Sequence, residues 1–329
     1  MRSICMTIIL ALSTIFATSA SAAETTLRIS LQLPLKSHLG QNLTLFKEEV
    51  ESSSNGEIEV QIFDSAQLYK DKEVPQAVGS GSIEMGVASL TRYVGDIPAV
   101  DIFYQPFLFN SADKVRKATA KGSGVRDPLD EAILDTGSRV LWWQAYGGAI
   151  MLSNGVVLKT PADIKDKKVR VFGKTLGEFV EAVGGTPTLI SGSEQFLAYQ
   201  RGTVDIGMTG VSGVQSRSLW DVMDTITVTN HADIEFVVVI NEEFWQGLPA
   251  EHKKIIEAAA ANADAAVRDK VAEIEAQAYA SAEEQGMTVY RPTAAEIEAW
   301  KIGAAPVLEK YQAAAGDLGA RVLKAANDL

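Results

Sequence analysis

The chain has 329 residues, of which 47% are hydrophobic and 22% are charged, and its net charge at pH 7 is −12. This acidic balance argues against nucleic acid and anionic lipid surfaces as partners, because both would repel the protein. An apolar content of this size can form two hydrophobic cores, so we expect two lobes.

The first 23 residues have the composition of a secretory signal peptide. Arg2 is followed by an apolar run at residues 4–17 and by small residues at 19–23. A charged start, an apolar middle and small residues before a cleavage site are typical of such leaders. The apolar run is too short to span a bilayer comfortably, so a membrane anchor is the less favoured alternative. We expect cleavage after Ala22 or Ala23 and export to the periplasm.

Cleavage would change the chemistry available to the protein. Cys5 is the one cysteine of the chain and lies in the leader. The exported protein would therefore contain no disulfide, thiolate metal site or cysteine nucleophile. Loss of Arg2 would leave 29 basic and 42 acidic side chains, a net charge of −13. No later stretch approaches 18 uninterrupted apolar residues, so we expect the exported protein to be soluble.

Beyond the leader, short β-branched runs alternate with helical patterns, which is typical of βαβ units. Strands are expected at residues 27–33, 58–63, 83–88, 139–144, 150–153, 168–172, 186–190, 204–208, 225–228 and 236–240. Helices are expected at residues 39–52, 72–78, 111–135, 175–183 and 194–200. The sequence therefore predicts an α/β fold with mixed sheets.

Two segments of the chain follow the same pattern. After a strand and a helix, Gly81 precedes Ile-Glu-Met-Gly-Val at residues 83–87, and Gly202 precedes Val-Asp-Ile-Gly-Met at residues 204–208. Both glycines suit helix ends that require a left-handed residue. We interpret the repeat as pseudo-symmetry between two lobes, although any two βαβ units share part of this pattern.

The last third of the chain is helical. Residues 249–285 form one pattern with Pro249 at its start and Gly286 after its end. A helix of this length spans roughly 50 Å, more than one small lobe. Its apolar positions do not keep a strict heptad, so a helix that bridges two lobes is favoured over a coiled coil. Two more helices are expected in residues 293–329.

These patterns define a domain organisation. We expect a first lobe of residues 24–148 plus 236–275 and a second lobe of residues 149–235 plus 276–329. The chain would cross between them near residues 146–149 and 231–236.

Motifs for catalysis or metal binding are absent from the sequence. The three histidines, His38, His231 and His252, have no histidine or cysteine partner at metal-ligand spacing. His252 lies between Glu251 and Lys253, which predicts a solvated helix face, whereas His231 precedes a strand and is expected to be a buried structural residue. No nucleophile elbow or P-loop occurs. We expect no cofactor, metal or catalytic residue, with a secreted enzyme on a two-lobed α/β scaffold as the alternative.

The segment Thr-Pro-Ala-Asp-Ile-Lys-Asp-Lys-Lys-Val-Arg-Val at residues 160–171 resembles the signature of the solute-binding proteins of TRAP transporters, the DctP-like family. Further matching segments follow in order along the chain, at residues 65–68, 81–85, 105–108, 184–187, 194–205 and 230–231. The resemblance implies a two-lobed, periplasmic-binding-protein-like fold with a long helix that spans both lobes. It also implies that the protein closes on a ligand and delivers it to a pair of membrane permease subunits.

The resemblance assigns the ligand-carboxylate arginine of the family to Arg170. A guanidinium at a strand end is a planar, bidentate donor that stays charged when it is desolvated. The alternative is a surface arginine that pairs with Asp163 or Asp166.

Other residues fall where the resemblance implies ligand contacts or walls of the site: Gln32, Asp71, Ser89, Arg92, Tyr146, Phe172 and Thr209. Gly155 stands where sialic-acid-binding members carry an arginine, and Thr209 stands where some members carry an asparagine. We therefore expect a small organic acid other than sialic acid, with one principal carboxylate on Arg170 and a second polar or anionic group on Arg92.

The expected partners are this acid and the TRAP permease, and we expect a monomer. Presentation of the ligand to a sensor kinase is a further alternative, since it would use the same pocket.

Overall fold

The structure is a computed structural model that describes residues 23–329. The predicted signal peptide, apart from Ala23, lies outside the described residues. Among those that are described, no helix has both the length and the apolar character needed to cross a membrane.

The strands form a mixed sheet in the order β10-β8-β4-β9-β3-β1-β2, with β7 also paired to β4 and with a separate β5-β6 pair. Their bounds are β1 Thr25–Ser30, β2 Ile58–Phe63, β3 Met85–Ser89, β4 Ser138–Ser153, β5 Lys168–Val171, β6 Thr186–Leu189, β7 Gly207–Gly210, β8 Thr225–Thr227, β9 Asp233–Asn241 and β10 Thr288–Tyr290. β1 is parallel to β2 and β3, whereas β9 is antiparallel to β3 and β4. The prediction of an α/β fold with mixed sheets is therefore confirmed.

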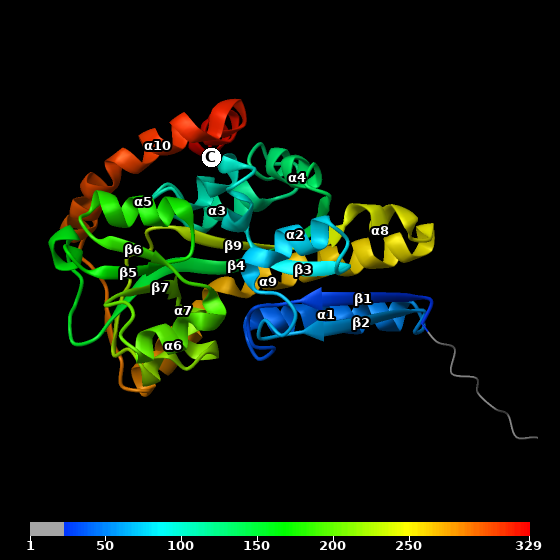
Figure 1. Ribbon diagram of the computed structural model, residues 1–329, viewed down its shortest axis with the longest axis horizontal. Coiled ribbons are helices and arrows are strands. Elements are labelled where there is room, and N and C mark those ends of the chain that lie inside the picture. The colour runs from blue at the N-terminus through cyan, green and yellow to red at the C-terminus, as the bar shows by residue number, and fades with distance from the viewer. Residues whose placement is uncertain (1–22) are drawn as a thin grey trace, which may run out of the picture.

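The strand β4 joins two lobes. Its first part pairs with β9, and its last residues pair with β7 and β8. We call the part built on β1, β2, β3, β9 and the start of β4 the first lobe. The second lobe is built on the end of β4 with β5 to β8 and β10. Figure 1 shows β1, β2 and α1 at one end of the molecule and β5 and β6 toward the other.

The prediction of two separate strands on either side of Gly147 and Gly148 is wrong. β4 continues through both glycines, which pair with Ile234 and Asp233 of β9. A register shift between Ala145 and Gly147 marks a bulge, and Gly147 has a positive φ of 98°. Such a bulge takes up an extra residue and bends the strand without ending the ladder.

The helices cover the faces of these sheets. Their bounds are α1 His38–Ser53, α2 Val74–Gly79, α3 Ala112–Thr119, α4 Arg126–Leu134, α5 Lys174–Ala182, α6 Gln195–Gln200, α7 Val211–Ser216, α8 Glu242–Gly247, α9 Ala250–Glu284 and α10 Ala294–Asn327. Short 3₁₀ turns are η1 Asp71–Glu73, η2 Leu90–Tyr93, η3 Pro98–Tyr104, η4 Pro161–Ile164, η5 Gly192–Glu194 and η6 Leu219–Asp221. The helix predicted at residues 111–135 is divided into α3 and α4 by a turn at Gly122, whose φ is 86°.

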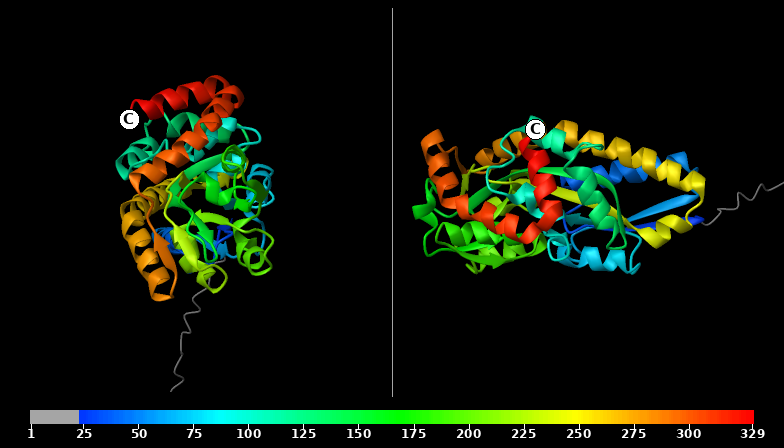
Figure 2. Two further views of the ribbon diagram at one scale, coloured as in Figure 1. Left: turned by 90° about the vertical axis from the view of Figure 1, so that its left-hand side faces the viewer. Right: turned by 90° about the horizontal axis from the view of Figure 1, so that it is seen from above.

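The helix α9 spans both lobes, as predicted. It packs against α1 in the first lobe and against α7 and β10 in the second. Figure 2 shows it running along one side of the molecule. Asn42 of α1 donates to the carbonyl of Ala263 in α9 (2.8 Å) and accepts from the indole of Trp142 in β4 (3.0 Å), so one buried amide joins three elements.

The helix α10 begins on the second lobe and ends on the first. Trp300 donates to the carbonyl of Lys159 (2.9 Å), whereas Tyr311 donates to the carbonyl of Ala99 in η3 (3.1 Å). Gly316 interrupts the helix with a non-helical φ of 58°. The two helices predicted in residues 293–329 are the two arms of α10. The residue boundaries predicted for the lobes stay a prediction.

Candidate functional site

The eight residues predicted for the site all line one cavity between the lobes. These are Gln32, Asp71, Ser89, Arg92, Tyr146, Arg170, Phe172 and Thr209. Five further lining residues were not predicted: Gly192, Gln195, Arg217, Ile234 and Phe236. The cavity has a volume of about 20 Å³, room for about one water molecule.

Strand ends bring these side chains together from both lobes. Gln32 follows β1, and Ser89 ends β3 in the first lobe. Arg170 lies in β5 and Thr209 in β7 of the second lobe. In open α/β sheets the carboxyl ends of parallel strands form the edge at which ligands bind. Tyr146, from the crossing part of β4, closes the cavity at the junction of the lobes.

Arg170 is buried and is held by backbone carbonyls. Its Nε donates to the carbonyl of Ile190 (3.0 Å), and its Nη1 donates to the carbonyl of Met208. The guanidinium also lies 5.1 Å from the centre of the Phe172 ring. Only 2% of the residue is exposed, and none of the ion pairs within residues 23–329 includes it. The alternative of a surface arginine paired with Asp163 or Asp166 is therefore not what the structure contains.

Burial lowers the pKa of Arg170 to about 10, and the positive charges of Arg217 and Arg92 act in the same direction. Nearby tyrosines partly oppose this effect. The residue stays cationic at neutral pH, but its charge is poorly solvated, and no carboxylate of residues 23–329 forms an ion pair with it. Such a guanidinium is suited to bind an anion from outside the protein.

Arg92, by contrast, is neutralised within the protein. Its Nε donates to Oδ2 of Asp71, and the two side chains are 7% and 1% exposed. Oδ1 of Asp71 accepts from the backbone nitrogen of Ser89 (2.9 Å). We expected Arg92 to meet the second group of the ligand, but the structure pairs its charge with Asp71.

An aromatic wall faces these charges. The ring centre of Tyr146 lies 5.2 Å from that of His38 and 5.3 Å from that of Phe236. Tyr104 contacts Phe172 edge to face at 5.9 Å. On the polar side, Oε1 of Gln32 is buried without a hydrogen-bond partner among the described residues.

Arg217 is the charged lining residue that the sequence analysis missed. It directly follows α7, and its Nη2 is 3.4 Å from the hydroxyl oxygen of Tyr146, to which it donates. Its Nε and Nη1 are buried and have no partner within residues 23–329. In the sequence, Arg217 stands seven residues after the end of β7. Because the helix α7 between them was not predicted, the sequence did not indicate that this arginine returns to the cavity.

The lobes also contact each other beside the cavity. Oδ2 of Asp101 in η3 accepts from the backbone nitrogen of Thr175 in the first turn of α5 (3.2 Å). Lys70 and Glu194 form an ion pair of 2.7 Å, and both side chains are nearly half exposed. Lys70 precedes η1 of the first lobe, and Glu194 ends η5 near the second lobe's share of the cavity.

On the other side of the crossing strands, α9 supplies two contacts. Glu275 accepts from the backbone nitrogen of Gly148 (2.9 Å). Arg268 forms a two-pronged ion pair with the fully buried Glu235 of β9, with 2.8 Å between Nη2 and Oε2. The long helix is therefore fixed directly to the segment where the lobes join.

The histidines serve the fold. His231 is fully buried, its Nδ1 is 2.7 Å from the hydroxyl of Thr229, and burial lowers its pKa to about 3. The prediction of a buried structural histidine is confirmed. His38 is buried against the carbonyl of Ala145 (3.1 Å), and burial lowers its pKa to about 4.

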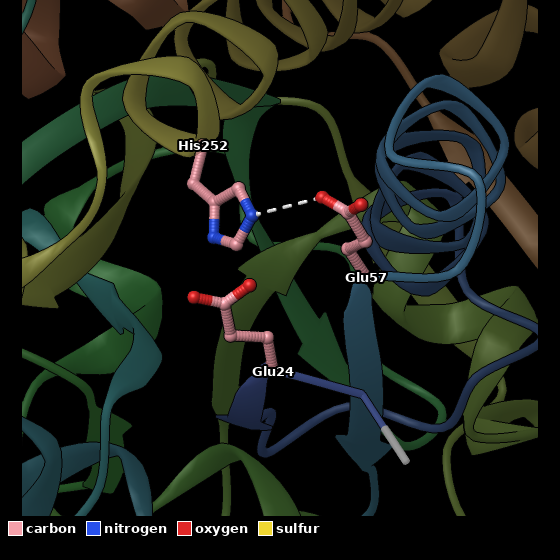
Figure 3. A group of neighbouring side chains, drawn as sticks. All are labelled: Glu24, Glu57 and His252. Atoms are coloured by element: carbon pink, nitrogen blue, oxygen red, sulfur yellow. Dashed lines mark ion pairs between the residues drawn. The ribbon is translucent and has the colours of Figure 1, made fainter. Parts of the chain in front are cut away.

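The prediction that His252 lies on a solvated face is wrong. The residue is 3% exposed, because the start of β1 covers the beginning of α9. Its Nδ1 is 3.0 Å from the hydroxyl of Thr25, and its Nε2 is 3.5 Å from Oε2 of Glu57. The side chains of Glu24, Glu57 and His252 have the spacing of metal ligands (Figure 3). Both ring nitrogens of His252 face protein partners, so these contacts tie the start of β1 and Glu57 to α9.

The sequence of this chain is similar to those of known solute-binding proteins. The family model described as "Bacterial extracellular solute-binding protein, family 7" (DctP) matches residues 29–314. The C4-dicarboxylate-binding periplasmic protein DctP of Rhodobacter capsulatus is 28% identical over 291 residues, which cover 87% of this chain and 86% of that protein.

Solved structures are similar over nearly the whole chain. A TRAP periplasmic solute-binding protein of Shewanella oneidensis with bound succinate has a TM-score of 0.86 and 26% identity, and the match covers 92% of this chain and 99% of that one. DctP7 of Bordetella pertussis, an extracytoplasmic solute receptor that binds pyroglutamic acid, has a TM-score of 0.87 at 20% identity, with 92% and 99% covered. The predicted two-lobed fold is confirmed by these neighbours.

Proposed function

Since this chain belongs to family 7 of the bacterial extracellular solute-binding proteins, the DctP family, we propose that it captures a small organic acid through Arg170. It is a solute-binding protein of the type that serves TRAP transporters. In this proposal the loaded protein delivers the acid to a TRAP permease in the membrane. A solute-binding protein releases its ligand chemically unchanged, so this proposal argues against the enzyme alternative.

The observation that carries the proposal is the state of Arg170. A buried guanidinium that is held by two backbone carbonyls, and that pairs with no carboxylate in the described part of the chain, is preorganised for an anion. The cavity beside it is lined from both lobes, so the ligand contacts are complete only when the lobes are together. Gln32, Ser89, Tyr146, Phe172 and Thr209 would supply the remaining contacts, and Asp71 would hold Arg92 in place.

The names of similar proteins support an acid as the ligand. They include a C4-dicarboxylate-binding protein, a structure with bound succinate and a structure with bound D-erythronate. These ligands differ in length and hydroxylation but share a carboxylate. A carboxylate is the group that Arg170 is suited to bind.

The family is extracytoplasmic or periplasmic. Export of this chain by the leader at residues 1–23 is part of the proposal, as are the predicted lobe boundaries at residues 148–149, 235–236 and 275–276. The acidic net charge of −12 repels anions at long range, so affinity must come from the short-range contacts inside the cavity.

A binding screen tests the proposal. The purified protein is heated with and without succinate, D-galacturonate, D-erythronate and pyroglutamate, and acids that raise the melting temperature are then titrated by calorimetry. Mass spectrometry of the released ligand checks that it is chemically unchanged. Binding with recovery of intact acid supports a transport role. Turnover of the acid would support the enzyme alternative, and the absence of binding by every carboxylate would contradict the proposal.

A further inference from the structure

Three side chains at the edge of the first lobe where β1 and β2 begin have the donor atoms of a metal site. One donor atom each from Glu24, Glu57 and His252 lies within 4.8 Å of the others. Figure 3 shows both carboxylates beside the imidazole ring. The residues stand just before β1, just before β2 and in the first turn of α9. Gln32 reaches the ligand cavity beyond the other end of β1, so this group is separate from the site already described.

His252 is buried, and its ring is oriented by a neighbouring hydroxyl. The residue is 3% exposed, and its Nδ1 is 3.0 Å from Oγ1 of Thr25. In metal sites the ring nitrogen that does not bind the metal usually forms a hydrogen bond with a protein group, which fixes the tautomer and the direction of the ring. With Nδ1 used by Thr25, Nε2 is the nitrogen that can bind a metal, and it faces Glu57.

The separation of His252 and Glu57 suits two ligands of one ion. Nε2 is 3.5 Å from Oε2 of Glu57, whereas N–H···O hydrogen bonds are about 2.7–3.2 Å long. Nitrogen and oxygen ligands lie about 2.0–2.2 Å from Zn²⁺, so neighbouring ligands of one ion are roughly 3–3.5 Å apart. The alternative is a direct ion pair between the two side chains, which requires a protonated imidazole.

The two carboxylates are close together and are not used elsewhere. The backbone nitrogens of Glu24 and Thr25 both donate to the carbonyl of Glu57, at 2.9 and 3.0 Å, so the main chain places the glutamates side by side. Among the described residues, the contact with His252 is the one ion pair that includes either glutamate. Both glutamates are exposed, which gives a hydrated ion a path to the buried imidazole. A divalent cation would balance both negative charges.

We propose that Glu24, Glu57 and Nε2 of His252 bind a divalent transition metal, of which Zn²⁺ fits best, with water completing its coordination. Imidazole and carboxylate together suit Zn²⁺, whereas Mg²⁺ and Ca²⁺ prefer oxygen ligands alone. The ion would join the beginnings of β1, β2 and α9 and so stabilise the folded protein. The three residues are far apart in the sequence, so no ligand spacing along the chain indicated this site.

Calorimetry with ZnCl₂ tests the proposal on untagged exported protein that has been treated with EDTA and dialysed. We expect one Zn²⁺ per chain and a higher melting temperature with Zn²⁺ than without it, because the assembled site exists in the folded protein alone. MgCl₂ and CaCl₂ should bind at least about tenfold more weakly, since these ions gain little from an imidazole ligand.

Variants identify the ligands. Glu57→Gln and His252→Ala should each weaken Zn²⁺ binding by at least about tenfold, because each removes a ligand. Thr25→Val keeps all three ligands but frees the ring, and should weaken binding by about tenfold. Glu251→Gln is the matched control, since it removes an exposed carboxylate next to His252 in the sequence and should bind Zn²⁺ as the wild type does.

Melting curves without metal check that each variant folds. Glu57→Gln is the decisive variant if His252→Ala does not fold, because the side chain of Glu57 is 66% exposed and its loss leaves the core intact.

Three results would overturn the proposal. One is a wild type that binds no Zn²⁺, which would leave the direct ion pair of His252 and Glu57. Another is a folded Glu57→Gln or His252→Ala protein that binds Zn²⁺ as tightly as the wild type. The third is equal affinity for Zn²⁺, Mg²⁺ and Ca²⁺, which would indicate an exposed acidic surface that makes no use of the imidazole. The screen with organic acids tests the proposed function separately.

Discussion

Asp101 of the first lobe caps α5 of the second lobe, since its Oδ2 accepts a hydrogen bond from the backbone nitrogen of Thr175 (3.2 Å). Asp101 is 1% exposed, and this burial raises the pKa of its carboxyl group to about 6. The contacts with Thr91 and Thr175 lower the pKa and oppose part of this rise. A contact between the lobes thus depends on a group that titrates near neutral pH.

The first prediction concerns pH. The pKa of an aspartate is about 4 in the unfolded chain and about 6 for Asp101 in the folded one, so its contribution to stability is present below pH 4 and is lost as the pH rises through 6. Between pH 4 and 7, Asp101 should lower the free energy of unfolding of the wild type by about 1–3 kcal/mol. Asp101→Asn should remove this pH-dependent loss. Urea denaturation at both pH values measures it. The control is Asp96→Asn at an exposed position of the same region. Equal pH slopes for wild type and Asp101→Asn would contradict the prediction.

The second prediction concerns Arg170. Loss of one partner of a buried charge pair costs about 2–5 kcal/mol, so Arg170→Ala should weaken binding of the acid found by the screen by roughly 30- to 3,000-fold. Arg170→Lys should recover part of the loss, because an ammonium keeps the charge but not the bidentate geometry. Calorimetry measures both, with melting curves as the folding control. Binding by Arg170→Ala within about threefold of wild type would remove Arg170 as the anchor.

The third prediction concerns the bulge at Gly147. A Cβ there would overlap the carboxylate of Glu275, and the residue has a φ of 98°. Gly147→Ala should destabilise the protein by about 1–3 kcal/mol, through backbone strain and displacement of Glu275 from Gly148. Gly155→Ala is a matched control, since Gly155 also has a positive φ of 68° but no atom within 4 Å of the added carbon.

Chemical denaturation compares the two glycine variants. The excess cost at Gly147 should shrink when Glu275 is also replaced by alanine, because the two changes then share one contact. A Gly147→Ala protein no less stable than Gly155→Ala would show that Glu275 moves aside freely.

The fourth prediction concerns the ion pair between Lys70 and Glu194. Both side chains are 41% or more exposed, so solvent screens their attraction. Lys70→Ala and Glu194→Ala should each weaken ligand binding by less than about fivefold, and the effect should fade as salt rises from 50 to 500 mM. Calorimetry of the two variants and their double mutant measures how much the interaction between Lys70 and Glu194 contributes to ligand binding. A larger effect that persists in high salt would mean that the pair is a structural part of the closed state.

The fifth prediction concerns motion. Ligand contacts come from both lobes, so ligand binding should favour the closed arrangement over open ones. X-ray scattering at saturating acid should give a smaller radius of gyration than the free protein. An unchanged profile would argue against closure by rotation of the lobes.

Local patterns were sufficient for much of the fold. The bounds of α9 could be predicted because Pro249, a run of helix-forming residues and Gly286 mark them within the sequence itself. Several of the predicted lining residues, such as Gln32, Ser89 and Thr209, lie at, just before or just after strand ends, and the family resemblance selected the set. Arg170 could also be named because the motif around it resembles a known family.

Long-range contacts account for the errors. The two glycines in β4 favour a break, and only the partner strand β9 keeps them in a ladder. His252 has polar neighbours in sequence, but Thr25, 227 residues away, covers it in the fold. Arg217 was missed because α7 has only 6 residues, too few for a periodic pattern.

The continuous ladder of β4 and β9 affects how easily the two lobes can rotate relative to each other. When two lobes are joined by loops, their reorientation costs little and the joint exchanges its amide hydrogens quickly. Here the joint is a pair of hydrogen-bonded strands, so closure must twist a ladder that also carries the core. The amides of residues 144–149 should therefore exchange among the slowest in the protein, and the hinge should act as a torsion spring that biases the lobes toward one resting angle.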